Sequence, residues 1–255
     1  MSELRLETVG EHALVCGDCL DVMTDIPDGS IDMILADLPY GTTQCKWDTI
    51  IPFEPLWKQY KRIIKGNGAI VLTASQPFTS ALVMSNPSMF KYAWVWDKVN
   101  RPTGHLNAKK QPLRISEDVV VFYSDQVSYF PQMEQGKPYK ATSRGRKTEN
   151  YGAQVDGVTT VNDGNYYPRN IISIPADERG TVGRIHATQK PVALMEYLIK
   201  TYSIVGETIL DNTMGSGTTI VASFNTGRKG IGIEKDPIIF QTAFDRVKNS
   251  LEGVK

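Results

Sequence analysis

"ETILDNTMGSGTTIVASF", residues 207–224, contains the strand, turn and helix signals that decide the fold of this chain. An apolar run ends in Asp211, and Gly215 and Gly217 then precede a helical pattern. Glycines permit a tight turn and close approach of a ligand, while a helix N-terminus offers free N–H groups. The stretch therefore predicts a ligand-binding turn between a buried strand and a helix, although the third glycine of the G-x-G-x-x-G pattern is absent.

The same alternation of apolar runs and helical patterns continues along the chain. Continuous apolar runs of this kind are typical of parallel strands covered on both faces, and they predict strands at 31–37, 68–74, 117–123, 208–211 and 229–234. Helical patterns cover 53–65 and 190–202, and Pro191 suits the first turn of the second of these helices. A last helix is predicted after Asp236 as N-cap and Pro237 as first residue. The predicted fold is α/β and doubly wound.

Composition excludes several classes of protein. The 255 residues suffice for one large α/β domain, and 28 Lys and Arg balance 28 Asp and Glu, so any basic surface must be local. No run approaches the ~18 apolar residues of a membrane span, and the N-terminus lacks a signal-peptide pattern. Three cysteines fit a reducing compartment, and the Cys16/Cys19 pair lacks further ligands at zinc spacing. We expect a cytoplasmic protein with no membrane partner and no metal site.

The middle of the chain is locally basic. Residues 91–150 contain 11 Lys or Arg against 6 Asp or Glu, and residues 125–170 are rich in polar residues and glycine, with little periodicity. A long irregular insertion in a compact domain is usually either functional or disordered. Both interpretations stay open from the residues alone.

Three acids are predicted to meet at one edge of the sheet. Asp37 and Asp211 each end a predicted buried strand, and in an open α/β sheet the ligand crevice lies beyond the carboxyl ends of the strands. Glu234 ends the next strand, where an acid hydrogen-bonds a ribose in nucleotide-binding folds of this type. We therefore expect a nucleoside-containing cofactor at the glycine turn and a second substrate at Asp37 and Tyr40.

Four ordered motifs carry a resemblance to a known family. "ADLPYG" (36–41), "HATQKPVALMEYLI" (186–199), "LDNTMGSGTT" (210–219) and "GIGIE" (230–234) resemble motifs of the S-adenosylmethionine-dependent amino-methyltransferases of DNA, in their β arrangement. "LVCGDCLDVM" (14–23) resembles the acidic loop of that family, and the similarity covers nearly the whole chain. The resemblance implies a mostly parallel, seven-stranded, Rossmann-like sheet in one catalytic domain, residues 1–255. It also implies an inserted target-recognition region at approximately residues 98–180.

The resemblance places catalysis at Asp37, Leu38, Pro39 and Tyr40. The exocyclic nitrogen of adenine is a poor nucleophile, and two acceptors gripping its N–H groups would direct its lone pair at a methyl donor. The Asp37 carboxylate and the Leu38 carbonyl would supply these acceptors, and Pro39 restricts the backbone before it. Tyr40 would stack on a base flipped out of the duplex. The alternative for Tyr40 is an ordinary half-buried turn aromatic.

The implied cofactor is S-adenosyl-L-methionine. Asp18 would accept from its adenine amino group or would instead cap a helix, and Lys190 would hold its methionine end or would instead be a solvated charge. The candidate cofactor-binding residues are Asp18, Cys19, Asp37, His186, Thr188, Gln189, Lys190, Asp211, Asn212, Thr213, Met214, Gly215, Ser216, Gly217, Thr218, Glu234 and Lys235.

The sequence departs from the family pattern in two motifs. Leu38 replaces the usual proline of the catalytic tetrapeptide, but this position would act through its carbonyl and Pro39 remains. Asn212 and Thr213 replace the more usual Pro-Phe, so an aromatic residue that could pack on the cofactor adenine is missing. We expect activity to survive, with cofactor affinity weakened or another apolar residue in that role.

The implied partner is double-stranded DNA, in a bacterial or prophage-encoded enzyme. A homodimer and a cognate restriction endonuclease stay open as further partners. We expect N6-adenine methylation because Asp opens the tetrapeptide, where cytosine-N4 enzymes more often carry Ser. The open alternatives are cytosine-N4 methylation, methylation of a glutamine amide or an RNA base, a degenerate DNA-binding module and, remotely, a nicotinamide oxidoreductase. Candidate DNA contacts are Arg101, Lys109, Lys110, Arg114, Arg144, Arg146 and Lys147.

Overall fold

The computed structural model describes residues 5–43, 45, 48–143, 147–148, 150, 152–153, 157–177 and 189–253, with 147–148 and 152–153 as backbone only. Four predicted site residues, Arg144, Arg146, His186 and Thr188, lie outside the described residues. The chain divides into two compact units. The large unit comprises Met1–Phe130 and Asn170–Lys255, and the small unit comprises Pro131–Arg169.

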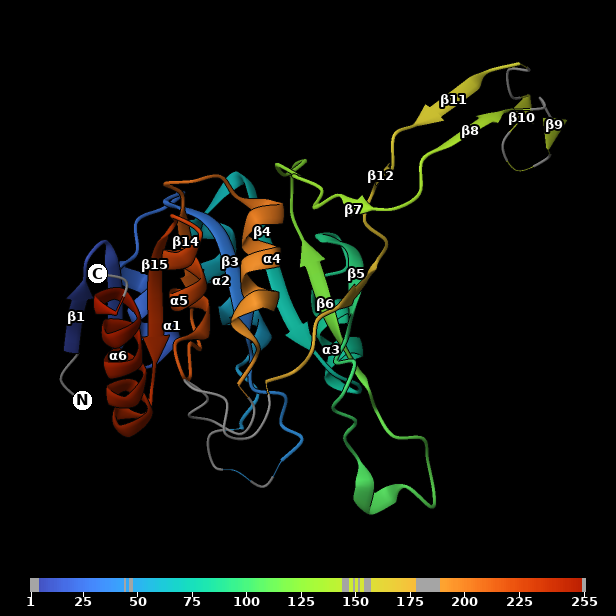
Figure 1. Cartoon of the computed structure of the whole chain (residues 1–255). Coiled ribbons are helices and arrows are strands. Elements are labelled where there is room, and N and C mark those ends of the chain that lie inside the picture. The colour runs from blue at the N-terminus through green and yellow to red at the C-terminus, as the bar shows by residue number, and fades with distance from the viewer. Residues whose placement is uncertain are drawn as a thin grey trace. The chain divides into compact units, whose positions relative to one another are not determined.

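A nine-stranded sheet forms the centre of the large unit (Figure 1). Its order is β1-β2-β15-β14-β3-β4-β6-β5-β13. From β2 to β4 the neighbouring strands are parallel, whereas β6 is antiparallel to both β4 and β5. The strands are β1 (Arg5–Val9), β2 (His12–Cys16), β3 (Ile31–Asp37), β4 (Ile64–Ala74), β5 (Phe90–Asp97), β6 (Ser116–Phe122), β13 (Ile171–Ser173), β14 (Thr208–Asp211) and β15 (Lys229–Glu234).

The predicted doubly wound, mostly parallel sheet is confirmed, but the predicted count of seven strands is wrong. Short strands extend both edges: β1 pairs antiparallel with β2, and β13 pairs parallel with β5 over three residues. Edge strands face solvent on many positions, so neither has the continuous apolar run that marks a central strand.

Burial on both faces explains why the central strands are apolar throughout. In β3, Met33 and Leu35 belong to one core cluster, whereas Ile34 and Ala36 belong to the other. Successive side chains of a strand point to opposite faces, so a strand between two helical layers needs apolar residues at every position.

Helices cover both faces of the sheet, as Figure 1 shows. One core cluster includes residues of α1 (Cys19–Val22), α2 (Phe53–Ile63) and α3 (Phe78–Ser85), and the other includes residues of α4 (Val192–Tyr202) and α5 (Thr218–Asn225). The third cluster joins α5 to α6 (Pro237–Glu252), whose N-cap Asp236 accepts from Ile238 and Ile239 as predicted. No helix in the described ranges has the length and apolar character needed to cross a membrane.

Several predicted boundaries are wrong, among them those of the strand predicted at 117–123, which is β6 at Ser116–Phe122. The helix predicted at 53–65 ends at Ile63, and β4 begins at Ile64 rather than at residue 68, because the backbone of Ile64 is already extended. The helix predicted at 190–202 begins at Val192, since Pro191 is its N-cap with an extended ψ of 138°.

The small unit consists of successive antiparallel strand pairs. Its pairs are β7 (Glu134–Gln135) with β12 (Asn165–Tyr166), β8 (Tyr139–Thr142) with β11 (Thr159–Asn162), and β9 (Lys147–Thr148) with β10 (Gly152–Ala153). The side chains of β8 are exposed throughout, and those of β11 nearly so. A ribbon exposed on both faces needs no alternation of apolar residues, so periodicity gives no sign of its strands.

Candidate active site

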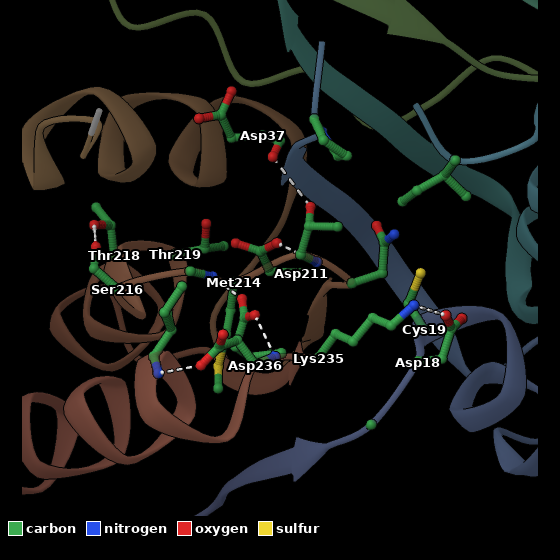
Figure 2. Close-up of a pocket in the computed structure, with 18 of the residues that line it drawn as sticks. Asp18, Cys19, Asp37, Asp211, Met214, Ser216, Thr218, Thr219, Lys235 and Asp236 are labelled. Carbon is green, nitrogen blue, oxygen red and sulfur yellow. Dashed lines mark hydrogen bonds and ion pairs between the residues drawn. The ribbon is translucent and has the colours of Figure 1, made fainter. Parts of the chain in front are cut away.

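Acidic side chains from three parallel strands meet at the carboxyl edge of the sheet. Asp37, Asp211 and Glu234 end β3, β14 and β15, and all three line a cavity of about 630 Å³. Figure 2 labels Asp37 and Asp211 in this cavity. This volume lies within the range of small-molecule sites. The predicted residues that line it are Asp18, Cys19, Asp37, Pro39, Gln189, Lys190, Asp211, Asn212, Thr213, Met214, Gly215, Ser216, Thr218, Glu234 and Lys235.

Three other predicted residues do not line the cavity. Leu38 is packed in the core, Tyr40 is half-buried, and Gly217 is the N-cap of α5. None of these three is among the residues that line the cavity. The cavity also has an apolar wall that the sequence did not indicate, formed by Leu20, Ile50, Ile51, Met195 and Ile239.

The glycine turn is held in place by α6 and by β15. Gly215 and Gly217 have φ angles of +50° and +78°, and a Cβ atom at Gly217 would lie 3.0 Å from Val247 Cγ2. Arg246 of α6 donates to the Ser216 carbonyl at 2.8 Å and to Thr218 Oγ1 at 2.9 Å. A side chain at Gly217 would therefore strain the backbone and make a tight contact with Val247 of α6.

Glu234 is anchored by main-chain donors. Its Oε2 accepts from Gly215 N at 3.1 Å and its Oε1 from Asp236 N at 2.9 Å. Burial, the largest influence, raises the pKa of Glu234 above its ordinary value despite these hydrogen bonds. The carboxylate is thus positioned at the cavity wall, where its remaining lone pairs can accept from a ligand hydroxyl.

Asp18 also lines the cavity and has two partners. Oδ1 accepts from Leu20 N at 2.9 Å, which confirms the helix-cap interpretation, and Oδ2 binds Lys235 Nζ at 2.9 Å. Figure 2 shows this ion pair beside the cavity. Burial opposes ionisation, but hydrogen bonds from Lys235 and Leu20 outweigh it and lower the pKa of Asp18.

Asn212 and Thr213, which depart from the family pattern beside the glycine turn, make specific contacts. Asn212 Oδ1 accepts from Tyr60 Oη at 2.5 Å, whereas its buried Nδ2 has no nitrogen or oxygen acceptor among the described residues and lies beside the weakly accepting Cys19 thiol. Burial raises the pKa of that thiol to about 11, so it is neutral near pH 7. Thr213 Oγ1 donates to the Asp37 carbonyl at 3.1 Å and so joins the glycine turn to the tetrapeptide.

Asp37 is surrounded by donors. Oδ1 accepts from Tyr40 Oη at 2.7 Å and from the Thr73 hydroxyl, and Oδ2 accepts from Lys190 Nζ at 2.8 Å. The Tyr40 ring stacks on Phe78, with centroids 5.1 Å apart, and the Lys190 ammonium lies 5.5 Å from its centroid. Burial and then the neighbouring Asp37 raise the pKa of Tyr40, which keeps this phenol protonated as a donor.

Lys190 belongs to a chain of four alternating charges. It is 8% exposed, so the alternative that it is a solvated charge is wrong. Its Nζ lies 3.2 Å from Glu117 Oε2, and Glu117 Oε1 lies 2.5 Å from Lys98 Nζ. Burial alone would lower the pKa of Lys190, but Asp37, Tyr40 and Glu117 together raise it well above its ordinary value. The ammonium is therefore retained between two carboxylates.

Asp48 organises the loop after the tetrapeptide. Its carboxylate accepts from the backbone N–H groups of Gly41, Thr42 and Thr43 at 2.8, 2.9 and 2.7 Å. Burial opposes ionisation, but these hydrogen bonds outweigh it and lower the pKa of Asp48. Sequence reasoning missed this residue, because its carboxylate binds backbone N–H groups five to seven residues earlier in the chain, beyond the range of a local turn signal.

The predicted basic residues fall in two places. Arg101, Lys109, Lys110 and Arg114 lie between β5 and β6 in the large unit, and none of them lines the cavity. Lys147 lies on β9 of the small unit.

Replacing Asp211 by Asn should change how stability depends on pH. Burial raises the pKa of Asp211 to about 7, against about 3.9 in an unfolded chain. Its contribution to stability is therefore complete below about pH 4 and is lost as pH rises through about 7. Asn does not titrate, so the free energy of unfolding of Asp211→Asn relative to wild type should rise by about 2 kcal/mol between about pH 5.5 and 7.5. Denaturant unfolding at both pH values measures this, with the exposed Asp25→Asn as control, and an equal difference at both would contradict the buried-acid interpretation.

Replacing Asp48 by Asn should loosen the loop without unfolding the protein. Charge-assisted hydrogen bonds contribute about 1.5–3 kcal/mol, so the amides of residues 41–43 should exchange with solvent at least ~10-fold faster. Hydrogen-exchange mass spectrometry checks this, again with Asp25→Asn as the matched control. Unchanged exchange in this loop would show that Asp48 does not hold it.

Comparison with known proteins identifies the family. Residues 31–245 match the family model N6_N4_Mtase, described as DNA methylase. The type II methyltransferase M1.MboII of Moraxella bovis is 24% identical over 237 residues, which span 85% of this chain and 89% of that protein.

Two solved structures share the fold. The M1.HpyAVI–SAM complex has a TM-score of 0.61 at 24% identity and covers 91% of this chain and 98% of its own. The cytosine-N4-specific PvuII DNA methyltransferase has a TM-score of 0.64 at 14% identity, over 96% of this chain and 94% of its own. Because the family model spans most of the sequence, the chain belongs to the N6/N4 DNA methylase family.

Proposed function

We propose that this protein transfers a methyl group from S-adenosylmethionine to the N6 amine of an adenine flipped out of double-stranded DNA. The observation that carries the proposal is that the Asp37 turn and the glycine turn line one cavity and are joined by the Thr213–Asp37 hydrogen bond. Parts of the chain some 170 residues apart thus supply adjacent sites for a donor and an acceptor.

The cavity suits the proposed cofactor. S-Adenosylmethionine, when bound, supplies a methyl group on a positively charged sulfur. Glu234, held by main-chain donors, would accept from the ribose, and Asp18 would accept from the adenine amine. The buried Asn212 Nδ2 offers a donor that lacks a strong acceptor within the described chain. The apolar wall that includes Leu20 and Ile239 would pack on the adenine in place of the missing aromatic residue. The crystallisation of M1.HpyAVI with SAM supports the same choice.

The target amine would replace a present partner of Asp37. Tyr40, Thr73 and Lys190 already donate to its carboxylate. We infer that the Lys190 ammonium, which also has Glu117 to bind, gives way and reaches toward the methionine carboxylate of the cofactor. Asp37 would then accept one N–H of the amine, the Leu38 carbonyl the other, and the carboxylate would receive the surplus proton after transfer. Positioning of this kind contributes much of the rate enhancement in two-substrate reactions.

The flipped base would stack on one face of the Tyr40 ring. Phe78 stacks on the Tyr40 ring, and the Lys190 ammonium lies 5.5 Å from the centroid of the same ring. Aromatic stacking contributes about 1–3 kcal/mol per base, which offsets much of the few kcal/mol that base extrusion costs. Departure of Lys190 would therefore open the stacking face and free the carboxylate together.

Residues 98–180 would read the DNA sequence. They include the small unit and the basic connection between β5 and β6. Exposed basic side chains of this kind contact phosphates and base edges.

Cytosine-N4 methylation is the second candidate function. The PvuII enzyme, which is cytosine-N4-specific, shares this fold, but at 14% identity the likeness concerns the fold alone. Asp37 at the head of the tetrapeptide favours adenine. Leu38, Asn212 and Thr213 motivate a third candidate, a DNA-binding module that transfers nothing.

Removing the Asp37 carboxylate should abolish methyl transfer. Asp37→Ala should lower tritium incorporation from labelled S-adenosylmethionine into DNA by at least ~10³-fold, because the amine loses its charged acceptor. Asp25→Ala, which removes an exposed acid, is the matched control. An Asp37→Ala protein as active as wild type would rule out the mechanism, and an inert wild type would favour the binding module.

The product nucleoside identifies the target base. Digestion of the methylated DNA should release N6-methyladenine, and N4-methylcytosine in its place would overturn the adenine assignment. Modification-aware sequencing of DNA from cells expressing the protein would give the methylated motif.

A further inference from the structure

The connection between β5 and β6 is a basic hairpin. General contacts with DNA, proposed above for its basic residues, do not account for the exposed apolar residue at its tip. We name residues 99–115 the prong. It carries Arg101, Lys109, Lys110 and Arg114 and no Asp or Glu. Its stem is closed by backbone hydrogen bonds from Lys98 N to Ile115 O at 2.9 Å and, in both directions, between Thr103 and Arg114 at 2.8 and 2.9 Å. Figure 1 shows it projecting from the large unit at the ends of β5 and β6.

A fully exposed leucine lies at the tip of the prong. The tip is a short 3-10 turn, His105–Asn107, entered through Gly104 at a φ of +93°. Hydrogen bonds from Asn107 N to Gly104 O and from Lys110 N to Asn107 O shape it, and the His105 ring contacts the Pro102 carbonyl at 3.0 Å. Leu106 is the most exposed large apolar side chain in the described part of the chain. Single exposed apolar residues are common, so exposure alone does not indicate a function for Leu106. Its position relative to the active site has to be considered as well.

The base of the prong is part of the active-site charge chain. Lys98 precedes the prong, Glu117 follows it, and these two residues form the buried ion pair that continues to Lys190 and Asp37. Arg114 of the prong also reaches Ser75, two residues after Thr73, at 3.4 Å. Because β5 is antiparallel to β6, and β6 to β4, the carboxyl end of β5 lies at the same edge as Asp37.

We propose that the prong is a wedge for duplex DNA, in which Leu106 enters the base stack beside the target and fills the space that the extruded base leaves. This inference rests on the proposed function. The acid-free prong complements the phosphate backbone, and Lys109 and Lys110 beside the tip would bind flanking phosphates. Apolar wedges inserted between base steps are an established means of unstacking DNA. Leu106 is thus a positioning residue, which stabilises the extruded state without touching the reacting atoms.

The test compares a paired target with an unpaired one. The substrates are two oligonucleotide duplexes carrying the motif obtained by sequencing, one matched and one with an abasic site opposite the target adenine. Leu106→Ala should lower kcat/KM on the matched duplex by at least ~10-fold, and the abasic duplex should restore it to within about threefold of wild type, because an unpaired base costs less to extrude. Leu106→Met, which keeps an apolar wedge, should stay near wild type. In a duplex with 2-aminopurine at the target position, Leu106→Ala should lose most of the fluorescence increase that wild type produces.

Controls separate the wedge from other failures. Met84→Ala removes another exposed apolar side chain of the large unit, on α3, and should behave as wild type on both duplexes. Leu106→Ala activity equal to wild type on the matched duplex, or reduced equally on both duplexes, would overturn the wedge. A wild-type protein that methylates neither duplex would instead overturn the proposed function, and the wedge with it.

Discussion

The parallel pairing of β3 with β14 is the constraint on which the site depends. Met33 pairs with Ile209 and Ile34 with Leu210, so that both strands end in an acid at the same edge. Both strands are buried on their two faces, and slipping one of them by a residue would exchange the faces that its side chains occupy. Core packing therefore sets the register, and the register sets the separation between the glycine turn and the tetrapeptide. The Thr213–Asp37 hydrogen bond closes the remaining gap between the two turns.

Alternating buried charges connect this edge to the element proposed to contact DNA. A single buried charge is costly, but Lys98, Glu117, Lys190 and Asp37 form a continuous series in which each charge has an opposite neighbour. In this series Lys190 pairs with two carboxylates, those of Asp37 and Glu117. A ligand that displaces Lys190 from Asp37 would leave the ammonium paired with Glu117, which is already in place. Glu117 also pairs with Lys98 at the base of the prong. The base of the prong and the Asp37 carboxylate thus share one set of ion pairs.

Sequence predicts those parts of the site that consist of local signals. β3, β14 and β15 have the predicted bounds because each is an apolar run that ends in an acid. The turn at Gly215 and Gly217 could be predicted because glycine readily adopts the positive φ angles that both residues have. Glu117, Lys98 and Thr73 could not be predicted, since their roles depend on strand pairing. Thr73 of β4 lies opposite Asp37 of β3, and Lys98 and Glu117 meet because β5 and β6 are antiparallel neighbours. Arg246 likewise acts through the packing of α6 on the glycine turn. The edge strands and the exposed ribbon of the small unit lack the apolar patterns from which strands are inferred.

The central claim is that donor and acceptor share the cavity between the two turns. The most direct measurement is a crystal structure of the protein with S-adenosylmethionine bound. We predict ribose hydroxyls within hydrogen-bond distance of Glu234 and the transferable methyl carbon within about 6 Å of the Asp37 carboxylate, close enough for an amine held there to attack. A cofactor bound in another cavity, or with its methyl group more than about 10 Å from Asp37, would contradict the account.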